Sequence, residues 1–445
     1  MAKKPLSLLY IVLMYTLPRK KSTMQRRYFL SASTAALATA NAAPSDVVTL
    51  AVIGVNGMGH GHVRNMVKRP DARIATLCDI DQSVAERAGQ TVQKETGRTP
   101  KLETDFRRVL EDKAIEAVVI ATPHHWHAPM AIRAMQAGKD VYLEKPASHV
   151  FREGRLLIDA ARKYKRIAQH GTQMRSSEVT AKAGELLKSG IIGEVRMSKA
   201  FNCQRHKHRA PVADSSAPAG VNYDMWLGPA AAGGFNANKF HGNWNWYRAF
   251  GNGDIGGDGI HDLDMARWGL GVTTHPVRIT AHGSRTDRTL TGEREFPDNM
   301  TVAYQYEDGR VLYYEERAFT GYGTFGFDSV NAFYGTEGYM VFTRRGYFQV
   351  YLGAKEEKGP SMRGGGGHPA HLYNFLECVR TRKEPEVNME VAHLSCGLVH
   401  LGEIGYRTGR VLHFDPKTEK FIKDPEADKL LTKKYRAPWT VPDPV

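Results

Sequence analysis

Lys145 is the residue whose type and setting point most directly to chemistry. It stands between Glu144 and Pro146, after the short apolar run 141–143. A lysine near a reacting hydroxyl can polarise the oxygen or relay its proton, and the proline ring stiffens the turn that directs the lysine. The structural alternative is an ordinary surface ion pair between Glu144 and Lys145. We expect Lys145 to act beside a bound cofactor.

A second candidate group lies in the glycine- and aspartate-rich stretch 253–264. His261 begins an apolar helix there, and Asp264, three residues further on, shares its helical face. Histidine carries protons readily near neutral pH, which makes His261, with Asp264 on the same face, a candidate catalytic group. The structural alternative is a helix N-terminal cluster around a histidine with satisfied hydrogen bonds.

The scaffold for these residues begins at Val48–Ile53, an apolar run that predicts a buried parallel strand. A glycine-rich turn and a helix start follow, an order that suits a pyrophosphate because backbone N–H groups converge on the anion. In the fingerprint G-x-G-x-x-G, Gly54 and Gly59 fit the first and third glycines, but Asn56 replaces the second. A strand–turn–helix without a ligand is the alternative. The turn residues expected to contact a dinucleotide are Gly54, Asn56, Gly57, Met58 and Gly59.

Asp79 ends the second predicted strand, 73–79. An acid at this place in a dinucleotide-binding unit hydrogen-bonds the ribose 2′-hydroxyl. Asp79 would also repel a 2′-phosphate, so NAD is favoured over NADP as the cofactor. The alternative is a solvated turn carboxylate.

Strands and helices alternate as far as residue 169. Helices are predicted at 83–96, 105–110, 129–137 and 152–164, and further strands at 117–121, 141–143 and 166–169. This alternation predicts a doubly wound parallel sheet, whose ligands bind at the carboxyl ends of the strands. The residues that follow two of these strands are therefore assigned to the cofactor: Thr122, Pro123, His124, His127, Glu144, Lys145 and Pro146.

The pattern changes after about residue 171. Strands are predicted at 195–201, 277–282, 299–306, 311–317, 329–335, 338–343 and 347–351, then a glycine-rich link at 361–367 and helices at 370–380 and 391–408. These elements predict an α+β domain with a large, mainly antiparallel open sheet. The expected organisation is a dinucleotide-binding domain at 44–170, a substrate and oligomerisation domain at 171–415 and a C-terminal arm at 416–445.

The long polar and aromatic section 202–253 offers material for binding a sugar. Tryptophan side chains can stack on the C–H face of a sugar ring, and the basic run 205–209 could hold an anionic group or form a solvated loop. Two histidines in that run, without a nearby acid or cysteine pattern, do not indicate a metal site. The candidate substrate-binding residues are Trp126, Arg175, Trp244, Trp246 and His261.

The formal net charge of +14 over 445 residues exaggerates the basic character of the folded part. Residues 1–43 contain seven basic residues and no acid, so the remaining 54 basic and 47 acidic residues carry a net charge of +7. No basic stripe with interleaved aromatic residues stands out, and nucleic acid is not an expected partner. The four cysteines are widely spaced and predict buried free thiols.

Residues 1–43 are predicted to be an export segment rather than part of the fold. Arg26 and Arg27 precede a mild, alanine-rich run at 31–43, an order that resembles a twin-arginine signal. The run is too short and too polar to span a bilayer, so no stable membrane span is expected after its removal. Met24 lies just before the arginine pair, which makes 1–23 a candidate upstream extension. The expected location is the periplasm; an uncleaved or lipid-anchored segment is the alternative.

Together these motifs resemble the glucose–fructose oxidoreductase / inositol dehydrogenase / MocA (Gfo/Idh/MocA) family from about residue 47 to 410. The resemblance implies a Rossmann domain followed by an open α/β domain, bound NAD(H) or NADP(H), a sugar-like substrate and a homodimer or homotetramer. It also implies that Lys145 and His261 act at the reacting carbon. The family usually has an aspartate four residues before the histidine, where this chain has Gly257. Asp258, Asp264 or a histidine from the aromatic section could replace that acid.

An exported enzyme of this kind must recycle its own cofactor, because the periplasm has no pool of free nicotinamide nucleotides. One solution is an oxidoreductase that oxidises one sugar and reduces another. A second is a NAD-dependent glycosidase that oxidises a ring carbon, eliminates the aglycone, adds water and reduces the carbon again. A third possibility is a non-catalytic sugar-binding protein that retains the nucleotide. The sequence leaves the first two designs open. The main hypothesis is a NAD-dependent oxidoreductase that acts on a sugar or glycoside by hydride transfer with a tightly held cofactor, and the glycosidase is the alternative.

Overall fold

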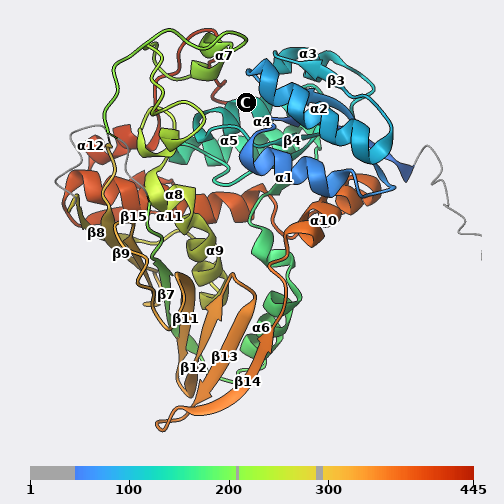
Figure 1. The fold of residues 1–445 in the computed structure, drawn as a ribbon. Coiled ribbons are helices and arrows are strands. Elements are labelled where there is room, and N and C mark those ends of the chain that lie inside the picture. The colour runs from blue at the N-terminus through green and yellow to red at the C-terminus, as the bar shows by residue number, and fades with distance from the viewer. Residues whose placement is uncertain (1–45, 207–209, 287–293) are drawn as a thin grey trace, which may run out of the picture. The chain divides into compact units, whose positions relative to one another are not determined.

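Six parallel strands form the first sheet of the computed structural model, which describes residues 46–206, 210–286 and 294–445 (Figure 1). Their order is β3-β2-β1-β4-β5-β6, the order of a Rossmann sheet. The predicted parallel sheet is therefore confirmed. The strands are β1 (Val48–Ile53), β2 (Ala72–Cys78), β3 (Lys101–Glu103), β4 (Ala117–Ile120), β5 (Asp140–Leu143) and β6 (Ala168–His170).

The helices between these strands agree with the prediction except at the start of one of them. Pro129 was expected to begin a helix, because proline favours the first turn, but α4 already begins at His124 and holds Pro129 in its interior. The earlier start places His124 and His127 on the first turn of α4, at the edge of the sheet. The helices are α1 (Gly57–Met66), α2 (Gln82–Thr96), α3 (Phe106–Glu111), α4 (His124–Gln136) and α5 (Phe151–Tyr164).

A ten-stranded sheet follows, in the order β14-β13-β12-β11-β7-β10-β9-β8-β15-β16. Only β7 and β10 pair in parallel, so the expected mainly antiparallel sheet is confirmed. The link predicted at 361–367 is partly wrong, because residues 361–363 belong to β14 and pair with β13. The strands are β7 (Val195–Asn202), β8 (Arg278–Ser284), β9 (Asn299–Gln305), β10 (Val311–Arg317), β11 (Ser329–Gly335), β12 (Gly338–Thr343), β13 (Tyr347–Leu352), β14 (Glu357–Arg363), β15 (Leu412–Asp415) and β16 (Lys420–Phe421).

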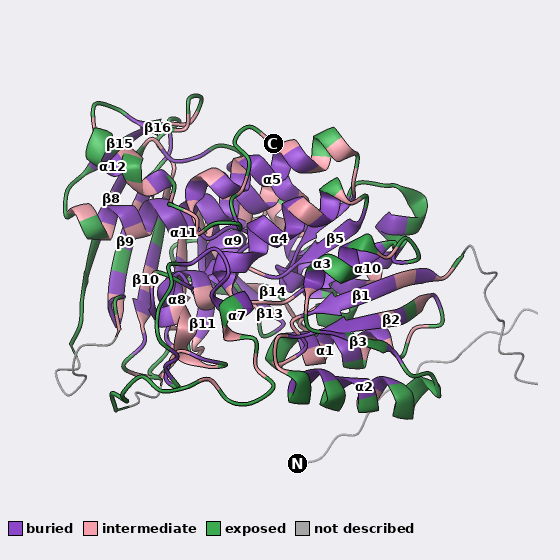
Figure 2. Cartoon of the chain, turned by 90° about the horizontal axis from the view of Figure 1, so that it is seen from above, coloured by how far each residue is buried: buried purple, intermediate pink, exposed green. Residues whose placement is uncertain are grey.

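Helix α9 (Gly259–Leu270) is the buried element that carries the second candidate group. Almost all of its residues are inaccessible to solvent, and it packs against β7, β11 and α11 (Met389–Thr408) (Figure 2). Helix α10 (His368–Thr381), although late in the chain, buries Phe375 and Leu376 against the first sheet. The other helices are α6 (Glu178–Lys188), α7 (Tyr223–Leu227), α8 (Gly253–Gly257) and α12 (Pro425–Asp428).

The C-terminal arm packs on helices of its own chain. The Trp439 ring lies 5.0 Å from the Trp126 ring and 6.0 Å from the Phe106 ring. Nearby, Lys433 Nζ lies 3.0 Å from Glu153 Oε1 on α5. The arm is thus fixed by buried aromatic and charged contacts, although its sequence is polar and rich in proline.

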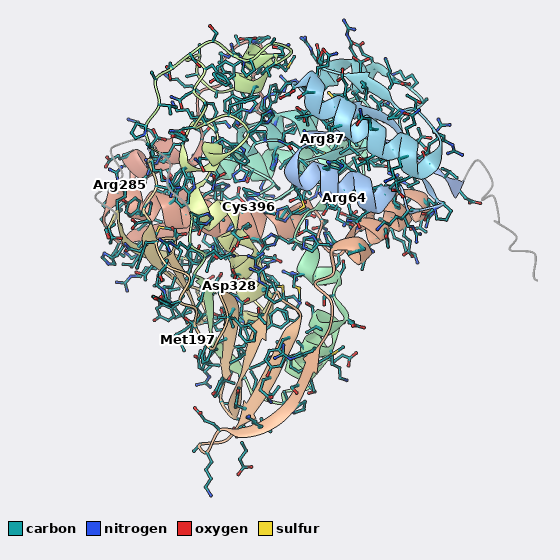
Figure 3. The ribbon with its side chains drawn as sticks, in the orientation of Figure 1. Arg64, Arg87, Met197, Arg285, Asp328 and Cys396 are labelled. Atoms are coloured by element: carbon teal, nitrogen blue, oxygen red, sulfur yellow. The ribbon has the colours of Figure 1, made fainter. Side chains whose placement is uncertain are left out.

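All four cysteines are free and buried, as predicted, and Cys396 lies in the interior on α11 (Figure 3). Within the described ranges, no helix combines the length and the apolar character needed to cross a membrane. The predicted export segment 1–43 and residues 207–209 of the basic run lie outside the described residues.

Gly269→Ala tests the packing of α9 against β11. Alanine is favoured over glycine in a helix by about 1 kcal/mol, but here its Cβ would lie 2.3 Å from Phe333 Cε1. Overfilling a packed core costs about 1–3 kcal/mol, so the variant should unfold at a lower urea concentration. Gly61→Ala on α1 is the matched control, since its Cβ would meet only Met58 Sδ at 3.9 Å. Equal unfolding midpoints for Gly269→Ala and wild type would contradict this packing.

Candidate active site

A cavity of about 460 Å³ lies at the carboxyl ends of the parallel strands. Most of the residues that the sequence assigned to the cofactor line it, because the turns after β1, β2, β4 and β5 meet at this edge. Gly59 and Pro146 are not part of the lining, although their neighbours are. The assigned residues in the wall are Gly54, Asn56, Gly57, Met58, Asp79, Thr122, Pro123, His124, His127, Glu144 and Lys145.

The glycine turn fits a pyrophosphate. Gly54 has φ +79°, and a Cβ there would lie 2.5 Å from the Ala121 carbonyl oxygen, whereas a Cβ on Gly59 would lie 1.8 Å from the Gly54 oxygen. These two glycines therefore allow the turn to close on the sheet. A Cβ on Gly57 would meet nothing within 4 Å, and Asn56 makes no side-chain capping bond to α1. The first N–H groups of α1 thus border open space, as an anion site requires.

Thr122 and Asp79 are polar residues of the cavity wall that suit the binding of a dinucleotide. The Thr122 hydroxyl is buried and has no partner among the described residues. Asp79 is 8% exposed and accepts hydrogen bonds from Val55 N at 2.9 Å and Asp81 N at 3.1 Å. The carboxylate is therefore fixed in the cavity wall rather than solvated, and burial raises its pKa. Its contact with a ribose stays a prediction.

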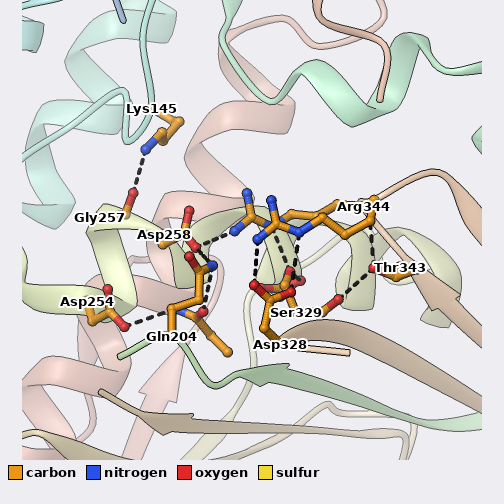
Figure 4. A network of polar contacts seen from close by, with 12 residues as sticks. Lys145, Gln204, Asp254, Gly257, Asp258, Asp328, Ser329, Thr343 and Arg344 are labelled. Carbon is orange, nitrogen blue, oxygen red and sulfur yellow. Dashed lines mark hydrogen bonds and ion pairs between the residues drawn. The ribbon is translucent and has the colours of Figure 1, made fainter. Parts of the chain in front are cut away.

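Glu144 and Lys145 do not form the ion pair that was the structural alternative. Glu144 Oε1 lies 2.9 Å from His62 Nε2 and accepts from Gln173 Nε2 at 2.8 Å. Burial opposes its ionisation, but the hydrogen bond and charge of His62 lower the pKa of Glu144 to about 2. Lys145 Nζ instead donates to the Gly257 carbonyl oxygen at 2.5 Å (Figure 4). The ammonium thus points from the cavity wall to the α8–α9 segment.

His261 stands at the start of α9 and is 6% exposed. Burial, followed by the positive charges of Arg344 and Lys145, lowers the pKa of His261 well below its ordinary value. The imidazole is therefore neutral at pH 7 and can accept a proton. The charge of Lys145 thus acts on the His261 imidazole. His261 is not among the residues that line the cavity.

Asp258, one of the acids expected near His261, belongs to a network of polar contacts (Figure 4). Sequence reasoning largely missed the other members of this network. Asp258 accepts hydrogen bonds from Arg344 and Gln204, and Arg344 Nε donates to Ser329 Oγ at 2.6 Å. Arg344 comes from the turn between β12 and β13, and no local pattern marks it. Asp258 is therefore engaged in an ion pair that holds this turn over α9.

Asp254 and His206 form a second acid–base pair in this region. His206 Nε2 lies 2.8 Å from Asp254 Oδ1, and Asn202 Nδ2 donates to Asp254 Oδ2 at 3.1 Å. Burial raises the pKa of Asp254. Burial alone would lower the pKa of His206, but the hydrogen bond and charge of Asp254 raise it. A histidine of the aromatic section thus pairs with an acid of the stretch 253–264. Its replacement of the family's aspartate stays a prediction.

Asp264 and Arg175, predicted to act in catalysis and in substrate binding, form an ion pair with each other. Arg175 Nε lies 2.7 Å from Asp264 Oδ2, and Ser395 Oγ donates to Asp264 Oδ1 at 2.7 Å. The two charged side chains are 1% and 5% exposed, and neither lines the cavity. Both carboxylate oxygens are used, so this geometry argues against proton transfer by Asp264 and substrate contact by Arg175. The pair instead anchors α9.

The three tryptophans predicted to bind substrate differ in whether they line the cavity. Trp244 lines the cavity with its ring 4.7 Å from the His124 ring, and it is therefore available for stacking. Trp126 also lines the cavity, but its indole N–H donates to the carbonyls of Met225 and Trp226. Trp246 is 2% exposed and outside the lining, which argues against the predicted stacking on substrate.

Comparison with known proteins identifies the class first. The model "Oxidoreductase family, NAD-binding Rossmann fold" matches residues 48–172, and "Oxidoreductase family, C-terminal alpha/beta domain" matches 185–322 and 365–441. The protein is thus an oxidoreductase of two parts with an NAD-binding domain. The chain belongs to the Gfo/Idh/MocA family, and the expected family, fold and cofactor are confirmed.

Among individual proteins, the chain is 25% identical over 377 residues to scyllo-inositol 2-dehydrogenase (NAD(+)) of Bacillus subtilis, covering 83% of this chain and 97% of that protein. It is 28% identical over 203 residues to an alpha-N-acetylgalactosaminidase of Shewanella oneidensis, covering 39% of this chain and 44% of that protein. The chain thus spans less than half the length of the first curated relatives it matches. A levoglucosan dehydrogenase in complex with NADH has the same fold, with a TM-score of 0.64 at 18% identity over 82% of this chain and 98% of that one.

The Arg175–Asp264 pair predicts a pH-dependent stability. Asp264→Asn leaves a buried guanidinium without its counter-charge, which costs about 3–5 kcal/mol. Burial would raise the pKa of Asp264, but the charge and hydrogen bonds of Arg175 lower it to about 2, below its value of about 3.9 in an unfolded chain. The pair's contribution is therefore complete above about pH 4 and is lost as the pH falls through about 2.

Urea unfolding of wild type and Asp264→Asn between pH 2 and 7 measures this difference. Glu185→Gln is the control, because its ion pair with Lys182 is exposed and should contribute less than about 1 kcal/mol. A constant difference between wild type and Asp264→Asn across the whole pH range would show that the carboxylate charge is not the cause.

Proposed function

We propose that this protein moves a hydride to and from a carbon of a sugar or glycoside, with NAD tightly held in the cavity. The observation that carries the proposal is the presence of Lys145 in the cavity wall, within electrostatic range of a neutral, buried His261. When bound, NAD supplies the hydride acceptor and returns the hydride. The residues of the chain then have to orient a hydroxyl group and carry its proton.

Lys145 and His261 suit these two tasks. The Lys145 ammonium is held by a backbone carbonyl rather than by a carboxylate, so it can donate to a substrate oxygen without breaking an ion pair. His261 is a neutral imidazole and takes the hydroxyl proton as the C–H bond breaks. Trp244 presents an aromatic ring to the cavity for the apolar face of the sugar.

The predicted export route supports retention of the cofactor. If residues 1–43 direct the chain to the periplasm, NAD has to be bound before export and restored within each cycle. The main hypothesis is an oxidoreductase that oxidises one sugar and reduces a second in the same site. A homodimer or homotetramer stays a prediction from family resemblance.

A NAD-dependent glycosidase is the second candidate, and the Asp254–His206 pair favours it. Elimination and hydration between the two hydride steps need proton carriers beyond Lys145 and His261. The pKa of His206 is raised beside Asp254, so this imidazole can be protonated near neutral pH. The similarity to an alpha-N-acetylgalactosaminidase over part of the chain points in the same direction.

Product analysis of the purified protein distinguishes these candidates and the non-catalytic alternative. A ketosugar or lactone formed together with a second, reduced sugar supports the oxidoreductase. Release of the aglycone from an aryl glycoside, without added cofactor or net redox change, supports the glycosidase. A change in the absorbance of bound nicotinamide without turnover supports a sugar-binding protein.

Lys145→Met removes the proposed hydroxyl-orienting group. We expect turnover to fall by at least about a hundredfold, the lower range for acid–base groups, while the protein still co-purifies with nucleotide. Lys163→Met is the control, because Lys163 is an exposed residue on α5 and does not line the cavity. Retained turnover in Lys145→Met would remove this residue from the mechanism.

Asp79→Ala tests the preference for NAD. Loss of the carboxylate removes a ribose acceptor and the charge that repels a 2′-phosphate, so the ratio of NAD to NADP affinity should fall. Titration of nucleotide-free protein with both nucleotides measures that ratio. An unchanged ratio in a folded variant would show that Asp79 serves only the backbone N–H groups of Val55 and Asp81.

A further inference from the structure

A second group of ligand-type side chains lies apart from the cofactor cavity. It consists of His275, just before β8, His393 on α11 and Glu419 in the turn between β15 and β16. His393 Nε2 lies 2.9 Å from Glu419 Oε1, and His275 Nε2 lies 3.8 Å from the same oxygen. One ligand atom from each residue lies within 4.8 Å of the others.

Two of these side chains have buried nitrogen atoms without partners. Both ring nitrogens of His275 and Nδ1 of His393 make no hydrogen bond to the described residues. The two side chains are 4% and 2% exposed. Buried polar atoms in folded proteins are nearly always satisfied, and an imidazole with neither nitrogen bonded is costly to bury. His275 therefore has two ring nitrogens that no described protein group occupies.

We propose that His275, His393 and Glu419 bind a divalent transition-metal ion such as Zn²⁺. Imidazole nitrogen and carboxylate oxygen are zinc ligands, with bonds of about 2.0–2.1 Å. Tetrahedral ligands at that length are about 3.4 Å apart, and the observed separations of 2.9 and 3.8 Å lie on either side of this value. Three protein ligands leave a fourth position for water.

Arg155 on α5 orients the carboxylate. Its Nη2 donates to Glu419 Oε1 at 2.5 Å and its Nε to Oε2 at 3.2 Å. Partners of this kind fix ligating groups in metal sites, although the positive charge of the guanidinium opposes a cation. The lining of the same hollow contains three further carboxylates, Glu307, Glu390 and Asp415, and two further cations, Arg278 and Lys417.

The site is open to solvent and separate from the cofactor cavity. A hollow of about 930 Å³ contains all three proposed ligands in its wall, and none of its lining residues lines the cofactor cavity. A bound ion would join α11, the start of β8 and the β15–β16 turn, and through Arg155 also α5. We therefore assign it a structural role that is independent of the proposed function.

Metal binding to the full chain tests this inference. Protein stripped with a chelator is dialysed against Zn²⁺ and its metal content measured; we expect about one ion per chain and a higher melting temperature. Co²⁺ replaces Zn²⁺ as a spectroscopic probe, and intense visible absorption would show four-coordinate ligation. His275→Ala and His393→Ala should each weaken Zn²⁺ binding more than tenfold. His413→Ala is the matched control, because His413 lines the same hollow but is not one of the three ligands.

The outcomes separate this site from the rest of the molecule. Wild type that binds no stoichiometric Zn²⁺, or Co²⁺ only with the weak spectrum of six-coordinate ions, would overturn the proposal even if the histidine variants fail to fold. Equal loss of Zn²⁺ in His413→Ala and His275→Ala would also overturn it. NAD content, measured in the same samples, should not change with Zn²⁺.

Discussion

The hydrogen bond from the Lys145 ammonium to the Gly257 carbonyl joins the two halves of the site. Lys145 comes from the edge of the parallel sheet, and Gly257 ends the short helix before α9. The bond fixes where the sheet edge meets the helix that carries His261. Because a carbonyl oxygen bears no full charge, the lysine remains a free cation for a substrate oxygen. The resembled family usually has an aspartate at this position, where this chain has Gly257.

Three acids on α9 or just before it each have a basic partner. Asp258 is paired with Arg344, Asp254 with His206 and Asp264 with Arg175. A buried charge without a partner is costly, so these pairs determine how α9 and its neighbours can pack. His261, among several positive groups, is kept neutral. Positioning and proton transfer are thus divided between different side chains of one region.

Elements distant in sequence complete the packing around the first sheet. Trp439 from the C-terminal arm packs on Trp126, which lines the cofactor cavity. Helix α10 supplies Phe375 and Leu376 to the core of the first sheet. The end of the chain therefore contributes to the domain that its beginning builds, and changes in the arm are expected to affect the cavity.

The sequence by itself determined the parallel sheet, its glycine turn and the places where ligand-binding side chains follow strands. Those features depend on local patterns: Val48–Ile53 forms the strand that its apolar run predicts, and carboxyl ends of parallel strands always meet at one edge. Only the tertiary structure decided which charged groups meet. Arg175 and Asp264, predicted for substrate and catalysis, neutralise each other, and Arg344 reaches Asp258 from a turn without any motif. Pairings between residues far apart in sequence depend on packing and on the cost of burying a lone charge. They cannot be predicted from the spacing of residues along the chain.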